Sequence, residues 1–219
     1  MRERQNSETM QKQYLDFLRN LLKDQPYVAL AYMTGILPVK KYGEHSALNM
    51  FIEYSMTDQD VLEEYTGFTG TEVKELYEQL QMNFAETGSW YDGYTFSDFR
   101  HIYNPKSVVE AMRRRKFSNY WASTEVYDAL KTYITMDFGG LRADIARMHV
   151  GGRVRVNTRS FRNDMHNFEV KDDVLTLLVH LGYLAYDSAE KEVFIPNKEI
   201  VEEFEMAMSV EVGQKSCVL

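Results

Sequence analysis

Apolar residues recur at helical spacing through much of the chain, and this pattern predicts a mainly helical protein. The first such stretch follows Ser7, a suitable helix N-cap, and ends near Asp24. Its apolar positions form one helical stripe: Met10, Tyr14, Phe17, Leu18, Leu21 and Leu22. We therefore expect an amphipathic helix near the N-terminus.

The run from Tyr27 to Met33 has a different pattern, because all of its residues are apolar. Thr34 and Gly35 stop the run, so it is too short for a helix. A continuous apolar run of this length indicates a strand buried on both faces, as in parallel sheets. One strand cannot form a sheet, so this prediction requires partner strands.

Further helices are predicted in the middle of the chain. Thr69, followed three residues later by Glu72, has the pattern of a capping box at a helix start. Thr57 or Asp58 can cap a weaker helix before it. The other expected helices span roughly residues 105–115, 123–135 and 139–149.

The C-terminal part has the clearest local topology. The expected elements are a strand at 154–156, an apolar helix after Asp172 and Asp173 that Gly182 ends, strands at 183–186 and 193–196, and a helix after Asn197. This order is typical of the end of a winged-helix-like unit, and it is also a common ending of α+β proteins.

Five aromatic residues surround one turn in residues 90–103, which we call the aromatic knot. They are Trp90, Tyr91, Tyr94, Phe96 and Tyr103, and Asp92-Gly93 forms the predicted turn. Asn104-Pro105 then ends the extended segment, with Pro105 in the first turn of the next helix. Two interpretations stay open: the knot is structural, or Tyr91, Asp92 and Tyr94 line a binding surface.

Composition narrows the class of protein. The chain has 219 residues, 44% of them hydrophobic and 13% aromatic, which is typical of a folded protein. A net charge of -8 argues against a general nucleic-acid or anionic-membrane binder. A single cysteine, Cys217, excludes an intrachain disulfide and a cysteine zinc site. With no window approaching the ~18 apolar residues of a membrane span, we expect a soluble, cytoplasmic protein.

The sequence contains no recognisable catalytic motif. It lacks a GxxxxGK[ST] phosphate loop, an apolar strand ending in Asp-Glu, and a GxSxG elbow. The five histidines are scattered, with no carboxylate at a useful spacing, so no metal site is expected. A self-contained hydrolase is therefore not expected.

One basic segment contrasts with the acidic chain. It contains Arg142, Arg147, Arg153, Arg155, Arg159 and Arg162. These arginines are suited to phosphate groups of a nucleic acid. They are equally suited to neutralise the acidic C-terminal part, in this chain or in a partner.

Five short motifs occur in one order: residues 32–35, 67–73, 90–96, 102–108 and 120–124. Together they resemble the bacterial predicted AAA-ATPase (AAA-ATPase-like) family, whose members often carry a C-terminal PD-(D/E)XK nuclease-like domain. The resemblance covers most of residues 10–205. The family's phosphate loop and Walker B strand precede the matched part, so the chain resembles a truncated or split member, or a fragment.

The resemblance implies a mainly α fold with small β elements. Its segments would be the end of an ATPase sheet (1–60), a helical lid with the aromatic knot (61–150), a winged-helix-like unit (151–208) and a flexible tail (209–219). It also implies that Thr34 senses a nucleotide's terminal phosphate. ATP and magnesium are implied for the full-length family, and no cofactor is expected in this chain alone.

Three functions follow from this resemblance. The first is a non-catalytic lid and winged-helix portion that contacts a partner protein or nucleic acid, with no enzyme activity of its own. The second is an ATPase completed in trans by a partner that carries the phosphate loop. The third is a structural remnant without a partner.

Overall fold

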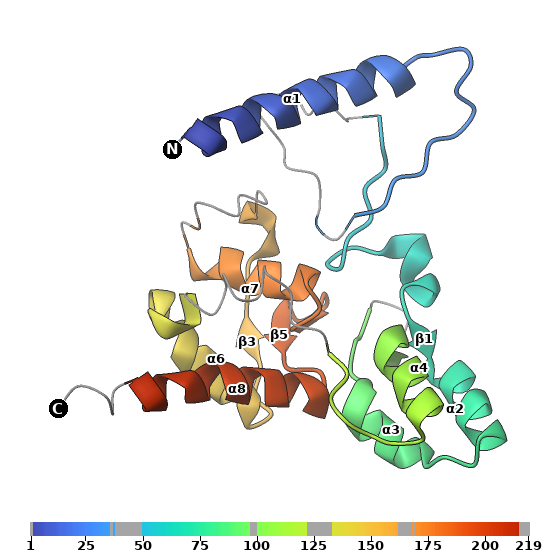
Figure 1. The fold of residues 1–219 in the computed structure, drawn as a ribbon, viewed down its shortest axis with the longest axis vertical. Coiled ribbons are helices and arrows are strands. Elements are labelled where there is room, and N and C mark those ends of the chain that lie inside the picture. Colours follow the sequence, from blue (N-terminus) through green and yellow to red (C-terminus); the bar gives the residue numbers. More distant parts are fainter. Residues whose placement is uncertain are drawn as a thin grey trace.

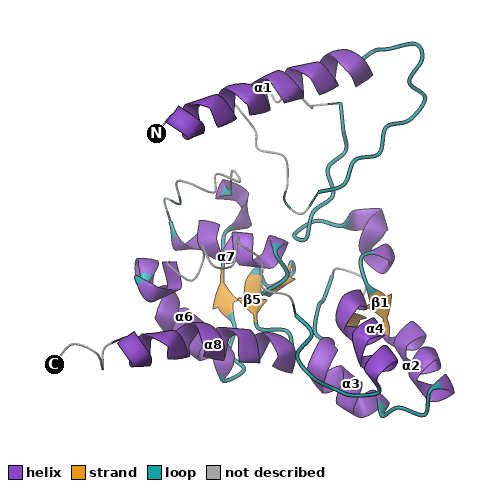
Figure 2. Cartoon of the chain, viewed as in Figure 1, coloured by secondary structure: helices purple, strands orange, loops and turns teal. Residues whose placement is uncertain are grey.

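The structure, a computed structural model, describes residues 2–35, 37, 50–96, 100–121, 133–161, 168 and 170–214 (Figures 1 and 2). This part of the chain is about half helical, with small antiparallel sheets, as the sequence predicts. Its α-helices are α1 (Arg2–Leu22), α2 (Gly70–Gln79), α3 (Phe84–Tyr91), α4 (Pro105–Arg114), α6 (Leu141–His149), α7 (Lys171–His180) and α8 (Lys198–Gln214). Its 3-10 helices are η1 (Asp60–Tyr65), η2 (Phe138–Gly140) and η3 (Thr158–Ser160). Its strands are β1 (Phe68–Thr69), β2 (Ile102–Tyr103), β3 (Val154–Arg155), β4 (Ala185–Asp187) and β5 (Glu192–Phe194).

Residues 2–35 form what we call the N-terminal arm, the blue ribbon that lies apart from the other helices in Figure 1. The predicted helix is confirmed as α1, although it begins at Arg2, so Ser7 lies inside it. The predicted buried strand at 27–33 is wrong, because these residues form no strand, and Leu30 and Tyr32 are 87% and 80% exposed. The physical reason is that a strand needs partner strands, and none of the described strands pairs with this run.

Helices α2, α3 and α4 pack with the β1–β2 pair into a first unit. The capping box at the start of α2 is confirmed, because the Glu72 N–H donates to Thr69 Oγ1 (3.3 Å) and the Thr69 N–H donates to Glu72 Oε2 (2.8 Å). Asn104 caps α4 by accepting the N–H groups of Lys106 and Ser107, and Pro105 begins that helix as predicted. One buried hydrophobic cluster of this unit consists of Val73, Tyr77, Tyr91, Tyr103, Val108 and Ala111.

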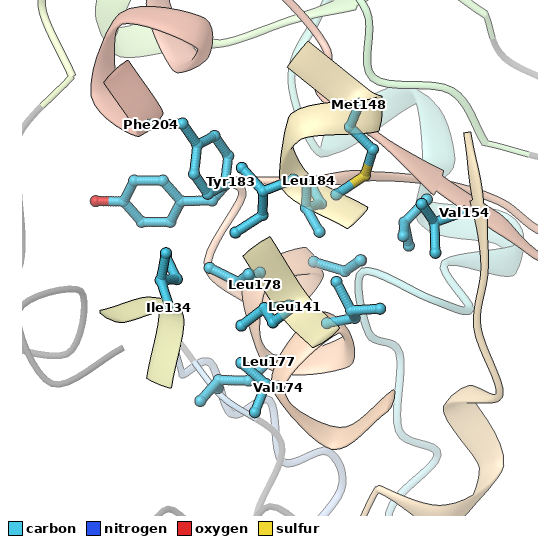
Figure 3. Close-up of a cluster of buried hydrophobic side chains, with 14 of the residues drawn as sticks. Ile134, Leu141, Met148, Val154, Val174, Leu177, Leu178, Tyr183, Leu184 and Phe204 are labelled. Atoms are coloured by element: carbon cyan, nitrogen blue, oxygen red, sulfur yellow. The ribbon is translucent and has the colours of Figure 1, made fainter. Parts of the chain in front are cut away.

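The second unit, residues 133–214, holds the largest core (Figure 3). Its antiparallel sheet has the order β3-β5-β4, so the hairpin β4–β5 follows α7 and β3 pairs with the second strand of that hairpin. The predicted alternation is confirmed, because Val154 and Val156 are buried and Arg155 is exposed. The core gathers side chains of α6, α7, α8 and the sheet, among them Leu141, Met148, Leu177, Leu178, Tyr183 and Phe204.

Several predicted boundaries differ from the structure. The weak helix expected after Thr57 or Asp58 is the 3-10 helix η1, which follows Gln59. Most of the helix expected at 123–135 lies outside the described residues. Helix α8 continues to Gln214, so the predicted flexible tail at 209–219 begins inside a helix.

The two units meet along α8. Tyr94 Oη donates to the Gly182 carbonyl (2.7 Å), and Lys198 Nζ lies 4.0 Å from the centre of the Trp90 ring. Glu199, which is fully buried, accepts hydrogen bonds from Ser107 Oγ (2.8 Å) and the Tyr120 N–H (2.5 Å). A carboxylate of the second unit therefore satisfies polar groups of the first.

Candidate functional site

The N-terminal arm carries the main concentration of exposed apolar side chains in the described structure. On α1 these residues recur at spacings of four, three and four, so they share one helical face. They continue into the segment after the helix. The exposed apolar residues are Met10, Tyr14, Phe17, Leu21, Tyr27, Leu30, Tyr32 and Met33.

After α1 the arm makes a turn, which local hydrogen bonds stabilise. Gln25 Nε2 donates to the Asn20 carbonyl (3.0 Å), and Tyr27 Oη donates to the Leu21 carbonyl (3.2 Å). These donors satisfy carbonyls that the last turn of a helix leaves without a partner. Asp24, at φ 57°, reverses the chain direction, and residues 27–35 then run on without regular structure.

The exposed apolar area of the arm is large for a surface that meets only water. At about 150–250 Å² for a whole aromatic side chain, these eight residues expose on the order of 1,000 Å². Contiguous apolar patches above a few hundred Å² mark interaction sites in soluble proteins. The arm is therefore a candidate protein-binding surface.

Thr34, the predicted nucleotide-sensing residue, lies at the end of this arm. Its side chain is exposed, and Gly35 follows it. Thr34 thus directly follows the exposed apolar segment that ends at Met33.

The aromatic knot divides between the core and the surface. Tyr91 is fully buried and donates from Oη to the Ser118 carbonyl (2.8 Å), and Tyr94 is 6% exposed. Burial raises the pKa of both phenols well above the ordinary range. Neither tyrosine offers surface to a ligand, while Asp92 stays half-buried.

Asp92 instead holds a histidine, which the sequence did not indicate. His101 Nδ1 lies 2.6 Å from Asp92 Oδ2, and Asp92 Oδ1 accepts the Gly93 N–H at 2.6 Å. A second carboxylate–histidine pair occurs at His149, whose Nε2 lies 2.9 Å from Glu205 Oε1. The paired residues are nine positions apart in the first case and 56 in the second, and neither separation is a spacing that a helix or strand pattern predicts.

An aspartate that orients an imidazole is a common arrangement in acid–base chemistry. The His101 side chain is 72% exposed, so its second nitrogen faces solvent. Among the described residues, no cluster of three or more His, Cys, Asp or Glu side chains could hold a metal ion. The Asp92–His101 pair alone therefore defines no reaction.

The described arginines of the basic segment are all exposed, and Arg153 in addition has contacts within the chain. Arg153 donates to Asp187 Oδ2 (2.8 Å) and stacks on Phe194 at 4.3 Å, so it joins β3 to the β4–β5 hairpin. The other described members of the segment are exposed: Arg142, Arg147, Arg155 and Arg159. Arg162 lies outside the described residues. Arg153 is therefore paired with an acidic residue of this chain.

One open hollow of about 650 Å³ lies beside α8. It is lined by Asn119, Trp121, Glu202, Glu203, Glu205 and Met206. Two of its three carboxylates already have partners, because Asn119 Nδ2 donates to Glu203 (2.8 Å) and Glu205 pairs with His149. The hollow is therefore a weaker candidate than the arm.

Comparisons with known proteins give no further guide to the site. No family model, curated protein or solved structure matches the chain. None of the described helices combines the length and the apolar character that crossing a membrane requires.

Proposed function

We propose that the chain is the non-catalytic lid and winged-helix-like portion of an AAA-ATPase-like protein and acts by binding a partner protein through its N-terminal arm. One observation carries the proposal. The arm exposes apolar side chains on one face of α1 and along residues 27–33, and water alone does not favour that arrangement.

The burial of α7 in the second unit favours a protein partner over a nucleic acid. The order α6, β3, α7 and hairpin β4–β5 supports the winged-helix-like description. Seven of the ten residues of α7, from Val174 to His180, are buried, so this helix presents little surface to a DNA groove. The exposed arginines remain the surface at which a nucleic acid would bind.

Affinity capture from the native host tests the proposal with two matched variants. Phe17→Glu places a charge in the apolar face of α1, whereas Lys12→Glu changes a charge on its polar face. We expect Phe17→Glu to lower recovery of the captured partner at least tenfold and Lys12→Glu to leave it unchanged. Equal recovery with both variants would exclude the apolar face of α1 as the binding surface.

The second candidate is an ATPase completed in trans by a partner that carries the phosphate loop. The position of Thr34 favours it, because Thr34 is exposed at the carboxyl end of the apolar segment. In α/β sheets, nucleotides bind beyond the carboxyl ends of the strands.

Phosphate release measured with the purified chain, the captured partner and their mixture tests this candidate. We expect turnover to require both proteins and to fall at least tenfold with Thr34→Ala, with Thr34→Ser as the control that keeps the hydroxyl. Turnover by the partner alone, at the rate of the mixture, would contradict it.

A further inference from the structure

We infer that residues 29–34 add as an edge strand to the β-sheet of the partner protein, and that α1 packs across one face of that sheet. This inference rests on the proposed function and specifies the kind of partner. That partner is a protein whose β-sheet has an open edge, and apolar helices, α1 among them, cover the faces of this sheet.

The backbone of this segment is available for pairing. In the described part of the chain, residues 29–34 make no hydrogen bond, and the last bond before them joins the Val28 N–H to the Gln25 carbonyl at 3.1 Å. Strand addition uses backbone N–H and C=O groups of this kind.

The side chains of the segment suit a strand covered on both faces. In an extended chain, successive side chains point to opposite sides. Leu30 and Tyr32 would lie on one face, and Ala29, Ala31 and Met33 on the other, so both faces are apolar up to the polar Thr34 that ends the first face. Strands with this composition occur in sheets that helices cover on both sides.

A second copy of this chain fits this surface poorly. Its described strands have two or three residues, whereas the six residues 29–34 would span about 20 Å when extended. Two such segments paired with each other would form a two-stranded ribbon, which is marginal in water and would leave both apolar faces uncovered. The partner therefore brings a sheet with longer strands.

Helix α1 is placed to cover that sheet. The capped turn at residues 23–26 joins it directly to the segment, and a helix followed by a buried strand is half of an α/β unit. The whole arm exposes on the order of 1,000 Å², above the ~800 Å² that each partner of a stable interface buries.

Photo-crosslinking in the host tests the inference. Benzoylphenylalanine replaces Tyr32, and the crosslinked peptides are identified by mass spectrometry. We expect the crosslinks to lie in one edge strand of the captured protein. Crosslinks to a helix, to a loop or to a second copy of this chain would overturn the inference, as would the absence of any crosslink.

A proline scan supplies the readout specific to strand pairing. An added edge strand pairs through alternate N–H groups, so only every second proline removes a bond. Among Ala29→Pro, Leu30→Pro and Ala31→Pro, we expect either the middle variant or the outer two to lower the crosslink yield at least tenfold. The controls are Ala29→Val, Leu30→Val and Ala31→Val, which keep the N–H group and should retain the yield. Equal effects of all three prolines would overturn the inference.

The experiments distinguish a failure of the proposed function from a failure of the strand inference. The arm contributes no residue to the buried core of either unit or to the third buried cluster (Tyr94, Phe96, Ile102 and Ala185), so these prolines should leave the urea unfolding of the rest of the chain unchanged. If Phe17→Glu abolishes capture while every proline variant retains it, the arm binds through α1 alone. The proposed function then stands, and the strand inference falls.

Discussion

His180 is an ionisable side chain within an apolar helix. It is 8% exposed and stacks on Phe161 with ring centres 5.3 Å apart. Burial lowers the pKa of this imidazole to about 4. The unfolded chain, in which the histidine titrates near 6.5, then binds the proton more readily than the folded chain.

We therefore predict that the folded state loses stability as the pH falls from about 6.5 to about 4. The loss from this group reaches about 3 kcal/mol, because each pKa unit corresponds to ~1.4 kcal/mol. Urea unfolding at several pH values measures it, with His180→Phe as the variant that keeps an aromatic ring and cannot titrate. The same pH slope in both proteins would contradict the assignment to His180.

Gly93 and Gly151 differ in how closely other atoms approach them, although both have the same kind of backbone conformation. Gly93 (φ 119°) and Gly151 (φ 85°) both have the positive φ that disfavours other residues. A Cβ on Gly93 would collide with the backbone of Pro196, whereas a Cβ on Gly151 would meet nothing within 4 Å. Gly93 thus allows the turn of the aromatic knot to contact the segment before α8.

We predict that Gly151→Ala lowers the free energy of unfolding by about 1 kcal/mol, through conformation alone. Gly93→Ala should lower the free energy of unfolding by at least ~2 kcal/mol more, because the turn or the backbone at Pro196 must move to accept the methyl group. Thermal or urea unfolding of the two variants checks the difference. Equal losses would mean that the contact with Pro196 adjusts without cost.

At the scale of elements, two arginines that are close in sequence make different contacts with the β3-β5-β4 sheet. Arg153 bonds to Asp187 on β4 and stacks on Phe194 of β5, whereas Arg155 is exposed on β3. We predict that Arg153→Ala lowers the free energy of unfolding by about 1 kcal/mol, and that Arg155→Ala changes it by less than ~0.5 kcal/mol. Urea unfolding measures both.

This difference decides how a nucleic-acid test should be designed. Arg155→Ala isolates an exposed charge, while Arg153→Ala also weakens the sheet. A fluorescence-anisotropy titration with DNA should therefore use Arg155→Ala and Arg159→Ala. Unchanged binding in both would remove these two arginines from consideration.

Elements with strong local patterns could be predicted from the sequence. Thr69 with Glu72 fixed the start of α2, and Asn104-Pro105 fixed the start of α4. Helix α3 was missed because its aromatic residues suggested a strand. Asn83, which accepts the N–H groups of Ala85 and Glu86, was the available indication of that helix.

The segment at 27–33 shows why the rest could not be predicted. Its pattern describes a buried strand, but burial depends on partner strands that no local pattern specifies. For the same reason, the exposed apolar face of α1 had the pattern of an ordinary core helix. The candidate site consists of residues whose pattern and environment disagree, so the structure was needed to locate it.

At the scale of the whole molecule, Glu199 links the two units. Its carboxylate lies on α8 and bonds to Ser107 at the start of α4 and to the Tyr120 N–H. Burial raises the pKa of this carboxyl, although the bonds from Tyr120 and Ser107 oppose that shift. Spacing could not predict this link, because it joins residues about 80–90 positions apart.

The link gives a prediction for how the molecule unfolds. Glu199→Ala leaves the buried Ser107 hydroxyl and the Tyr120 N–H without a partner, so the free energy of unfolding should fall by about 2–4 kcal/mol. Glu199→Gln keeps an acceptor of nearly the same shape and removes a charge that burial disfavours. It should match or exceed the wild type at neutral pH. Relative to this variant, the wild type should lose stability as the pH rises, because the folded chain holds the Glu199 proton more tightly than the unfolded chain.

The two tryptophans of the chain can report each unit separately. Trp90 belongs to the first unit, and Trp121 packs on Tyr183 of the second with ring centres 5.2 Å apart. Urea unfolding of the Trp90→Phe and Trp121→Phe proteins should give coincident transitions with Glu199 present. The transitions should separate with Glu199→Ala, because the buried link no longer couples the units. If Glu199→Gln separates them equally, the charge itself is required, and the link depends on an ionised carboxylate.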